Sequence, residues 1–119
     1  MIPIAPHEFE QLVEQALGEL PKRFSDLLHN IAVIVEEEPS PSDRAVLADP
    51  RYELLGIFRG IPRTKRTYGM TSMPDTIAIF RGPILRTARN RDDAVGQIRD
   101  TVVHELGHYF GLSDDAMPY

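Results

Sequence analysis

The N-terminal part of the chain carries apolar side chains at intervals of three and four, which is the spacing of one helix face. The apolar positions are Phe9, Leu12, Val13, Ala16, Leu17 and Leu20, and the acidic ones between them are Glu8, Glu10, Glu14 and Glu19. This pattern predicts an amphipathic helix that begins at Pro6, because proline and acidic side chains both suit a helix N-terminus. Pro21 ends this helix or restarts a second short one, in which Phe24, Leu27 and Leu28 would face the core.

Three short apolar runs follow, and each predicts a strand. Residues 31–35 are continuously apolar and largely β-branched, and the run stops abruptly at the three glutamates and the proline of residues 36–39. Residues 53–60 and 75–81 are the second and third predicted strands. The long hairpin-like connection between these two favours antiparallel pairing. Helices and strands together predict an α+β fold.

Shorter helical turns are predicted between the strands and before the last helix. Residues 42–48 would form one turn with Ser42 as its cap, and residues 84–89 would form another. The last helix is expected to begin near Asp92, where acidic side chains meet its positive end, and to run to about Phe110. Gly111 is the natural residue to end it.

The last helix has two chemically different sides. At about 100° per residue, one arc is apolar and the opposite arc is polar. The apolar arc holds Val95, Ile98, Val102, Leu106 and Tyr109, with Val103 and Phe110 at its margin, and the polar arc holds Gln97, Thr101, His104 and His108. The apolar arc is therefore expected to pack on the core, and the histidines are expected to face a cleft.

The polar arc contains a His-Glu-x-x-His sequence formed by His104, Glu105 and His108. Histidines four residues apart project from one helix face about one turn apart, so both reach a single metal ion. Glu105 stands beside them, where its carboxylate could take a proton from a metal-bound water. The pattern predicts a zinc site with His104 and His108 as ligands and Glu105 as the catalytic base.

A catalytic zinc ion usually has three protein ligands, so a third is expected elsewhere in the chain. Asp114 is the preferred candidate, because Gly111 permits a left-handed turn that brings a residue three positions later back towards the histidines. Asp115 is the nearest alternative. His7 and His29 are interpreted as residues at a helix start and a helix end.

Two charged runs have alternative interpretations. The glutamates of residues 36–38 could bind a metal, but a solvated strand end is preferred because charge runs usually stay in water. Arg59, Arg63, Lys65 and Arg66 could bind an anion or nucleic acid. Exposed charges that protect a sheet edge from aggregation are the preferred interpretation of these basic residues.

Composition narrows the range of functions. The 119 residues suit one domain, and 42% hydrophobic and 26% charged residues are ordinary for a folded protein. A net charge of −5 argues against nonspecific binding to nucleic acid. Because the chain has no cysteine, a metal must be held by His, Asp or Glu. There is no apolar stretch of secretory or membrane-spanning length, so a cytoplasmic location and no membrane association are expected.

His104, Glu105, His108, Gly111 and Asp114 form a His-Glu-x-x-His-x-x-Gly-x-x-Asp sequence that resembles the zincin metallopeptidases. Most of the chain also resembles the small bacterial zincin-like proteins described as possible zinc metallopeptidases. The resemblance implies a minimal zincin-like fold, in which a small mixed sheet packs on the N-terminal helix and the active-site helix. It also implies Zn²⁺ as cofactor, a peptide or protein as substrate, and an edge strand over the cleft, which we assign to residues 77–81.

The sequence departs from the larger zincins in two respects. Metzincins have a histidine where Asp114 stands, and a Met-turn for which only Met117 could substitute here. Because only five residues follow Asp114, we expect the site to lack the wall that normally closes the far side of the cleft in larger zincins. The leading hypothesis is a zinc peptidase, and the alternative is a zinc-containing peptide-binding or regulatory module without turnover. The sequence does not identify an oxyanion-stabilising residue. Tyr68 and Tyr109 are the candidates, and packing is the preferred interpretation of Tyr109.

Overall fold

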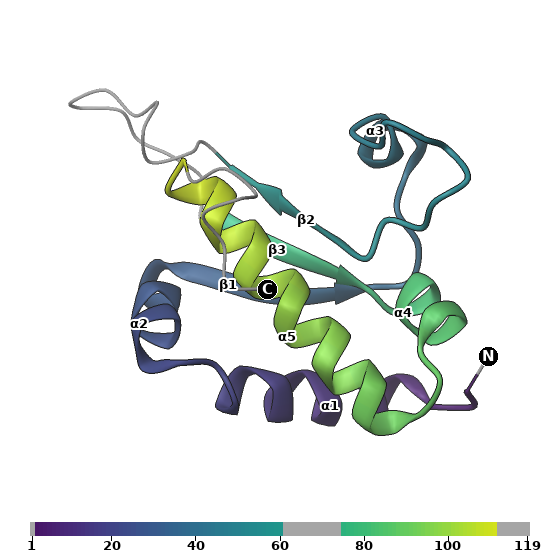
Figure 1. The fold of residues 1–119 in the computed structure, drawn as a ribbon, viewed down its shortest axis with the longest axis horizontal. Helices are drawn as coiled ribbons and strands as arrows, with labels where there is room; N and C mark the ends of the chain where they lie inside the picture. The colour runs from purple at the N-terminus through teal and green to yellow at the C-terminus, as the bar shows by residue number, and fades with distance from the viewer. Residues whose placement is uncertain (1, 61–74, 112–119) are drawn as a thin grey trace.

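The computed structural model describes residues 2–60 and 75–111, which form an α+β fold (Figure 1). Its elements are α1 (Pro6–Gly18), α2 (Lys22–Ser25), the 3₁₀ helix η1 (Asp26–Asn30), β1 (Ile31–Glu36), α3 (Pro41–Arg44), β2 (Gly56–Arg59), β3 (Asp75–Phe80), α4 (Arg81–Thr87) and α5 (Arg91–Tyr109). The predicted N-terminal helix, its short successor after Pro21, the three strands and the last helix are all confirmed. In the described ranges, no helix combines the length and apolar character needed to cross a membrane.

The three strands form one mixed sheet in the order β1-β3-β2. β3 pairs in parallel with β1 and antiparallel with β2, so Ile77 stands between Val33 and Phe58. The antiparallel pairing predicted for the second and third strands is therefore confirmed. The assignment of residues 77–81 to the edge strand is wrong, because β3 is central and Arg81 already begins α4. From Ile77 to Phe80, β3 is apolar on both faces, because each face of the sheet is covered by an apolar cluster. The edge strand beside α5 is β2.

Each face of the sheet has its own apolar cluster. Ile77 and Ile79 point to the face covered by α1, α4 and α5, where most of the buried residues lie. Ala78 and Phe80 point to the opposite face and pack with Leu54 from the segment that precedes β2. Figure 1 shows α5 crossing the sheet, with α1 running below it. The helix that carries the histidines is therefore fixed to the sheet by its apolar side, as its pattern predicted.

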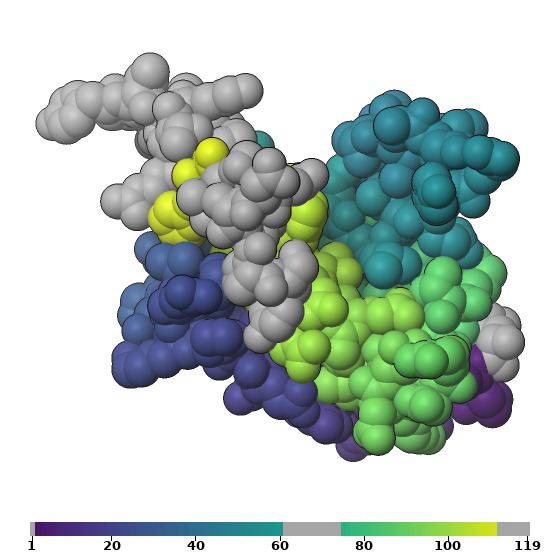
Figure 2. Space-filling view, in the orientation of Figure 1, coloured from purple at the N-terminus to yellow at the C-terminus, as the bar shows by residue number. Residues whose placement is uncertain are grey.

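Gly56 allows α5 to approach β2 closely. A methyl group at this position would lie 2.6 Å from Thr101 Cγ2 and 2.8 Å from the carbonyl oxygen of Ala78. Carbon atoms do not approach neighbours at such distances, so any side chain at Gly56 would push the helix and the sheet apart. The space-filling view shows the surface of α5 directly beside the teal segment that leads into β2 (Figure 2).

Two short helices begin earlier than the sequence pattern predicted. α3 begins at Pro41, and its cap is Ser40, whose hydroxyl accepts a 3.0 Å hydrogen bond from the Asp43 N–H, so the prediction of Ser42 as cap is wrong. α4 covers residues 81–87 and not 84–89. Pro83 is compatible with this start, because the first-turn N–H groups of a helix need no intrahelical partner. α5 begins within one residue of the predicted start, with Asn90 as its cap.

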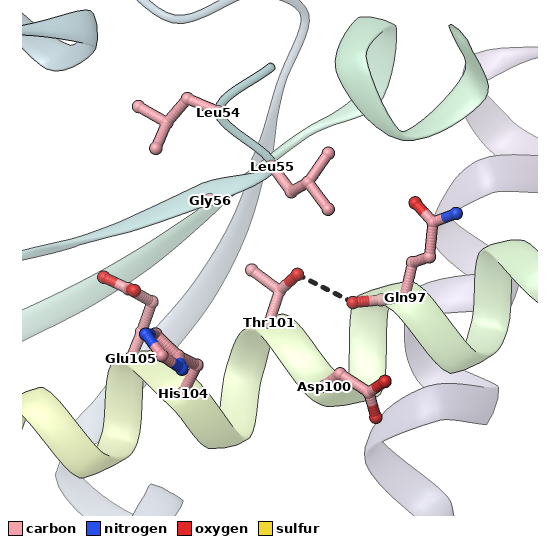
Figure 3. Close-up of a pocket in the computed structure, with 8 residues that line it drawn as sticks. All are labelled: Leu54, Leu55, Gly56, Gln97, Asp100, Thr101, His104 and Glu105. Atoms are coloured by element: carbon pink, nitrogen blue, oxygen red, sulfur yellow. Dashed lines mark hydrogen bonds between the residues drawn. The ribbon is translucent and has the colours of Figure 1, made fainter. Parts of the chain in front are cut away.

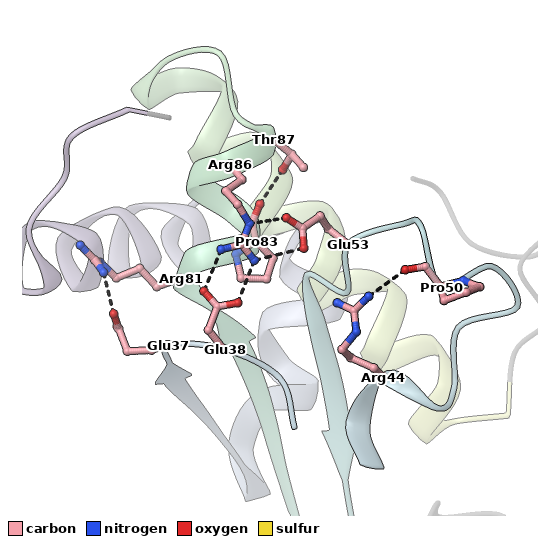
Figure 4. Close-up of polar contacts among 9 residues, drawn as sticks. All are labelled: Glu37, Glu38, Arg44, Pro50, Glu53, Arg81, Pro83, Arg86 and Thr87. Carbon is pink, nitrogen blue, oxygen red and sulfur yellow. Dashed lines mark hydrogen bonds and ion pairs between the residues drawn. The ribbon is translucent and has the colours of Figure 1, made fainter. Parts of the chain in front are cut away.

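The glutamates that follow β1 lie at the surface, but each binds a different arginine. Glu37 accepts from Arg81 over 2.7 Å, and Glu38 pairs with Arg86 over 2.7 Å and 2.8 Å. Arg86 also binds Glu53, so the segment after β1, the segment before β2 and helix α4 meet at one guanidinium group (Figure 4). The run is thus a set of ion pairs, and its carboxylates are committed to holding chain segments together.

The ion pair of Glu36, the first glutamate of the run, crosses the sheet. Arg59 of β2 reaches over the Phe80 ring of the central strand and binds Glu36 of β1 at 2.6 Å and Asp43 of α3 at 2.9 Å. One side chain therefore links both outer strands with the helix that follows β1. The remaining basic residues predicted for this hairpin lie outside the described residues.

Gly56→Ala is expected to destabilise the protein by about 1–3 kcal/mol, the usual cost of forcing extra volume into a packed contact. Gly18→Ala is the matched control, because no atom lies within 4 Å of its added methyl group. The control should be neutral or slightly stabilising, since alanine favours the helix more than glycine does. Urea unfolding of both variants measures the difference. Equal free energies of unfolding for Gly56→Ala and Gly18→Ala would show that α5 and β2 are not in close contact.

The Arg86 cluster predicts a pH-dependent contribution to stability. Hydrogen bonds from Arg86 hold the pKa values of Glu38 and Glu53 below their usual range. Because these folded-state pKa values are lowered, the stabilisation is present above the ordinary glutamate pKa and is lost as pH falls through the lowered values. Arg86→Gln should therefore lower the melting temperature at neutral pH, and this deficit should shrink in acid. Arg23→Gln removes an exposed arginine charge outside the cluster, so any change that it causes in the melting temperature should not depend on pH in this way.

Candidate metal centre

The final turns of α5 bring His104, Glu105 and His108 together. One potential ligand atom from each residue lies within 4.8 Å of those of the other two. The two imidazole rings stand edge to face with centroids 4.6 Å apart. Imidazole nitrogens are donors that zinc prefers, and the Glu105 carboxylate stands beside the two histidines, so the group suits a zinc site with a neighbouring acidic side chain. The other proposed ligands, Asp114 and Asp115, lie outside the described residues.

The Glu105 carboxylate is held between α5 and β2. The backbone N–H of Phe58 donates a 2.7 Å hydrogen bond to its Oε1, and its Oε2 lies 3.4 Å from His108 Nδ1. The Glu105 side chain is only 12% exposed. A side chain anchored at both oxygens is fixed in orientation beside the histidines, which is the arrangement that a positioned base requires.

The strand residue that binds Glu105 was not found from the sequence. The donor is the backbone N–H of Phe58. Every residue except proline has such a group, so residue type does not reveal which one donates. One indirect signal was present, because an interior strand glycine such as Gly56 often marks the close approach of another element. The pairing register explains why this N–H is available. Leu55, Ile57 and Arg59 direct their backbone groups to β3, so those of Gly56 and Phe58 point away from the sheet.

The pKa of Glu105 is raised above its ordinary value. Burial is the main cause, because it removes water from the ionised carboxylate. The hydrogen bond from Phe58 and the nearby His108 and His104 lower this pKa, but they offset only part of the effect of burial. In the metal-free protein this carboxylate is therefore a stronger base than an exposed glutamate.

A cavity of about 330 Å³ opens next to the histidine and glutamate side chains (Figure 3). It is lined by Leu54, Leu55 and Gly56 on the strand side and by Gln97, Asp100, Thr101, His104 and Glu105 on the helix side. The Thr101 hydroxyl donates to the backbone oxygen of Gln97, so its methyl group is left as an apolar part of the wall. The Asp100 carboxylate binds Arg99. The cavity therefore offers an apolar surface directly beside His104 and Glu105.

The other residues considered in the sequence have different surroundings. The Tyr109 ring packs on Phe58, with centroids 5.2 Å apart, and contacts the main core. His7 and His29 are exposed, at the start of α1 and near the end of η1. In the part of the chain that the structure describes, neither belongs to a group that could share a metal ion. Tyr68 and Met117 lie outside that part.

Glu105→Gln should stabilise the metal-free protein more in mild alkali than in acid. Because the folded-state pKa of Glu105 is raised, its ionisation costs folding free energy. This cost is absent below the ordinary glutamate pKa, grows as pH rises towards the raised value and is complete above it. Glutamine keeps an oxygen for the Phe58 N–H but carries no charge. Urea unfolding in a chelator tests this, with Glu14→Gln as the control for losing an exposed negative charge. An equal effect at all pH values would contradict it.

Comparison with known proteins is consistent with this geometry. No curated protein matches the chain. The solved structure of a conserved hypothetical protein from Thermus thermophilus is similar, with a TM-score of 0.57 and 24% sequence identity over 88% of this chain and 92% of that one. This likeness concerns the fold alone. A family model described as zincin-like metallopeptidase matches residues 28–119, which include all of the candidate site residues. The chain therefore belongs to the zincin-like metallopeptidase family.

Proposed function

We propose that the protein is a zinc-dependent peptidase, in which His104 and His108 are metal ligands and Glu105 is the general base. The observation that carries the proposal is the fixed Glu105 carboxylate, which is bound by the Phe58 N–H next to two imidazoles on the same helix. A helix that held zinc only for structural purposes would not require a neighbouring carboxylate anchored by a strand.

Asp114 is the proposed third ligand, with Asp115 as the alternative. The end of α5 supports a reversal of the chain. Gly111 has a positive φ of 75°, and its N–H donates to the carbonyl oxygen of His108 over 3.0 Å. A left-handed glycine directly after a helix turns the following residues back towards its last turn. A ligand three residues beyond this glycine is therefore a chemically reasonable completion of the site.

When bound, zinc would polarise the scissile carbonyl group and lower the pKa of water. The residues of the chain supply the proton transfers and the orientation. Glu105 accepts a proton from the attacking water and returns it to the leaving amine. The Phe58 N–H holds Oε1 and restricts rotation of the carboxylate, so that Oε2 keeps its position beside His108.

The shape of the site supports an extended peptide as substrate. Backbone groups of Gly56 and Phe58 point outward from the edge strand, and the Phe58 N–H is already taken by Glu105. The carbonyl groups of both residues and the Gly56 N–H are suited to pairing with a peptide backbone. The adjacent cavity, with Leu54 and Leu55 in its wall, favours a substrate with an apolar side chain next to the cleaved bond.

The purified protein is expected to retain about one equivalent of zinc after dialysis, because three protein ligands hold zinc tightly. His104→Ala should retain much less. His29→Ala is the matched control, since His29 is exposed and lies on η1. Metal content measured by mass spectrometry distinguishes the two variants. Equal zinc in His104→Ala and the unaltered protein would contradict the assignment of this site.

Glu105→Gln should keep the zinc and lose about 10²–10⁴-fold in peptide hydrolysis, the usual contribution of a general base. Cleavage of a peptide library rich in apolar residues, measured by mass spectrometry, provides the assay. Glu19→Gln serves as control, because Glu19 follows α1 and lies outside the site. Retained zinc with peptide binding and no cleavage in the unaltered protein would instead support a binding module.

A further inference from the structure

The outer edge of β1 has no paired strand among the residues that the structure describes. In the described ranges, β1 pairs with β3 on one side and with no strand on the other. Its six residues are apolar up to Glu36, and the register with β3 is continuous, without a bulge. Natural edge strands usually carry a proline, a bulge or an inward charge that prevents pairing with another chain. β1 has none of these, so it is able to accept a further strand.

A groove lies between this edge and helix α1. It has a volume of about 400 Å³ and is lined by Glu10, Val13, Glu14, Leu17, Val33, Ile34 and Val35. The four helix positions are spaced as one stripe, so a single side of α1 faces the strand. In the view of Figure 1, α1 runs below β1. The walls of the groove are apolar, and two carboxylates stand on its helix side.

The charges on and next to α1 indicate what the groove binds. Glu8 pairs with Arg91 over 2.6 Å, and Glu19 approaches Arg99 at 3.7 Å. Glu10 and Glu14, which line the groove, are exposed and make no ion pair with any residue that the structure describes. The carboxylates without a cation are thus the ones at the groove. A second copy of the chain would bring its own Glu10 and Glu14 against them, so like-charge repulsion disfavours self-association here.

We propose that the groove between α1 and β1 binds an extended segment of a partner protein in which apolar residues alternate with lysine or arginine. The segment adds to β1 as a further strand. Because successive side chains of a strand point to opposite faces, its basic side chains lie on the face of Val33 and Val35, towards Glu10 and Glu14 on α1, and its apolar side chains lie on the opposite face beside Ile34. This site lies at the opposite edge of the sheet from β2 and the candidate metal centre. The inference does not depend on the proposed peptidase activity.

A fluorescein-labelled peptide of sequence Thr-Lys-Val-Arg-Val-Lys-Val-Thr tests this proposal with the full-length protein. Fluorescence anisotropy measures its affinity, and amide chemical shifts of Val33, Ile34 and Val35 locate its binding site. The peptide is expected to bind and to shift these resonances. No binding at millimolar peptide, or shifts confined to other elements, would overturn the proposal.

Two double variants separate local charge from net charge. Glu10→Gln/Glu14→Gln and Gln11→Lys/Gln15→Lys both make the protein more positive by two charges on the same helix, but only the first pair lies in the groove. The first should weaken binding about five- to tenfold at low salt, and the second should change it by less than about twofold. All four positions are exposed, so both variants are expected to fold. Equal weakening by the two variants would overturn the assignment of these carboxylates.

Two further peptides test strand addition. One carries N-methyl groups at its odd residues and the other at its even residues, so each lacks the N–H donors of one edge. A peptide that adds to β1 uses the donors of one edge only, so one isomer should bind and the other should not. Equal binding of both isomers would overturn strand addition. Sedimentation equilibrium that showed dimers disrupted by a β1 variant, with no peptide bound, would assign the edge to a second copy instead.

Discussion

The contact between α5 and β2 is the constraint on which the rest of the structure depends. It is closed by the hydrogen bond from the Phe58 N–H to the Glu105 carboxylate, and it exists because Gly56 has no side chain to keep the helix away. The same contact forms one wall of the cavity and withdraws the carboxylate from water, which raises its pKa. The orientation of the Glu105 carboxylate, its raised pKa and the wall of the cavity therefore all result from this one contact.

Local sequence patterns predicted most of the helices and the cluster of His104, Glu105 and His108, because both depend on spacing within a single helix. The strand order was not predictable in the same way. Which strand is central depends on pairings between distant segments, and so β3 was mistaken for the edge. The contribution of Phe58 was also out of reach, since a main-chain donor is common to all residues except proline.

The two edges of the small sheet are chemically different. The β2 edge contacts α5 and uses one of its outward N–H groups to orient an acidic side chain. The β1 edge faces a groove with apolar walls and two exposed carboxylates. Arg59 connects them, because its guanidinium group crosses the central strand to bind Glu36. A sheet of three strands therefore presents two distinct surfaces while one side chain ties its outer strands together.

Phe58 and Glu105 are 47 positions apart in the sequence, whereas the two histidines lie about one helical turn apart. Contacts between distant residues carry a larger loop-closure entropy and form later in folding than local ones. The two histidines can therefore come together as soon as α5 is helical. The orientation of Glu105 has to wait until β2 has joined the sheet. A chain that had folded only in part would hold the histidine pair without an aligned Glu105 carboxylate, so native topology itself delays the completion of the candidate centre.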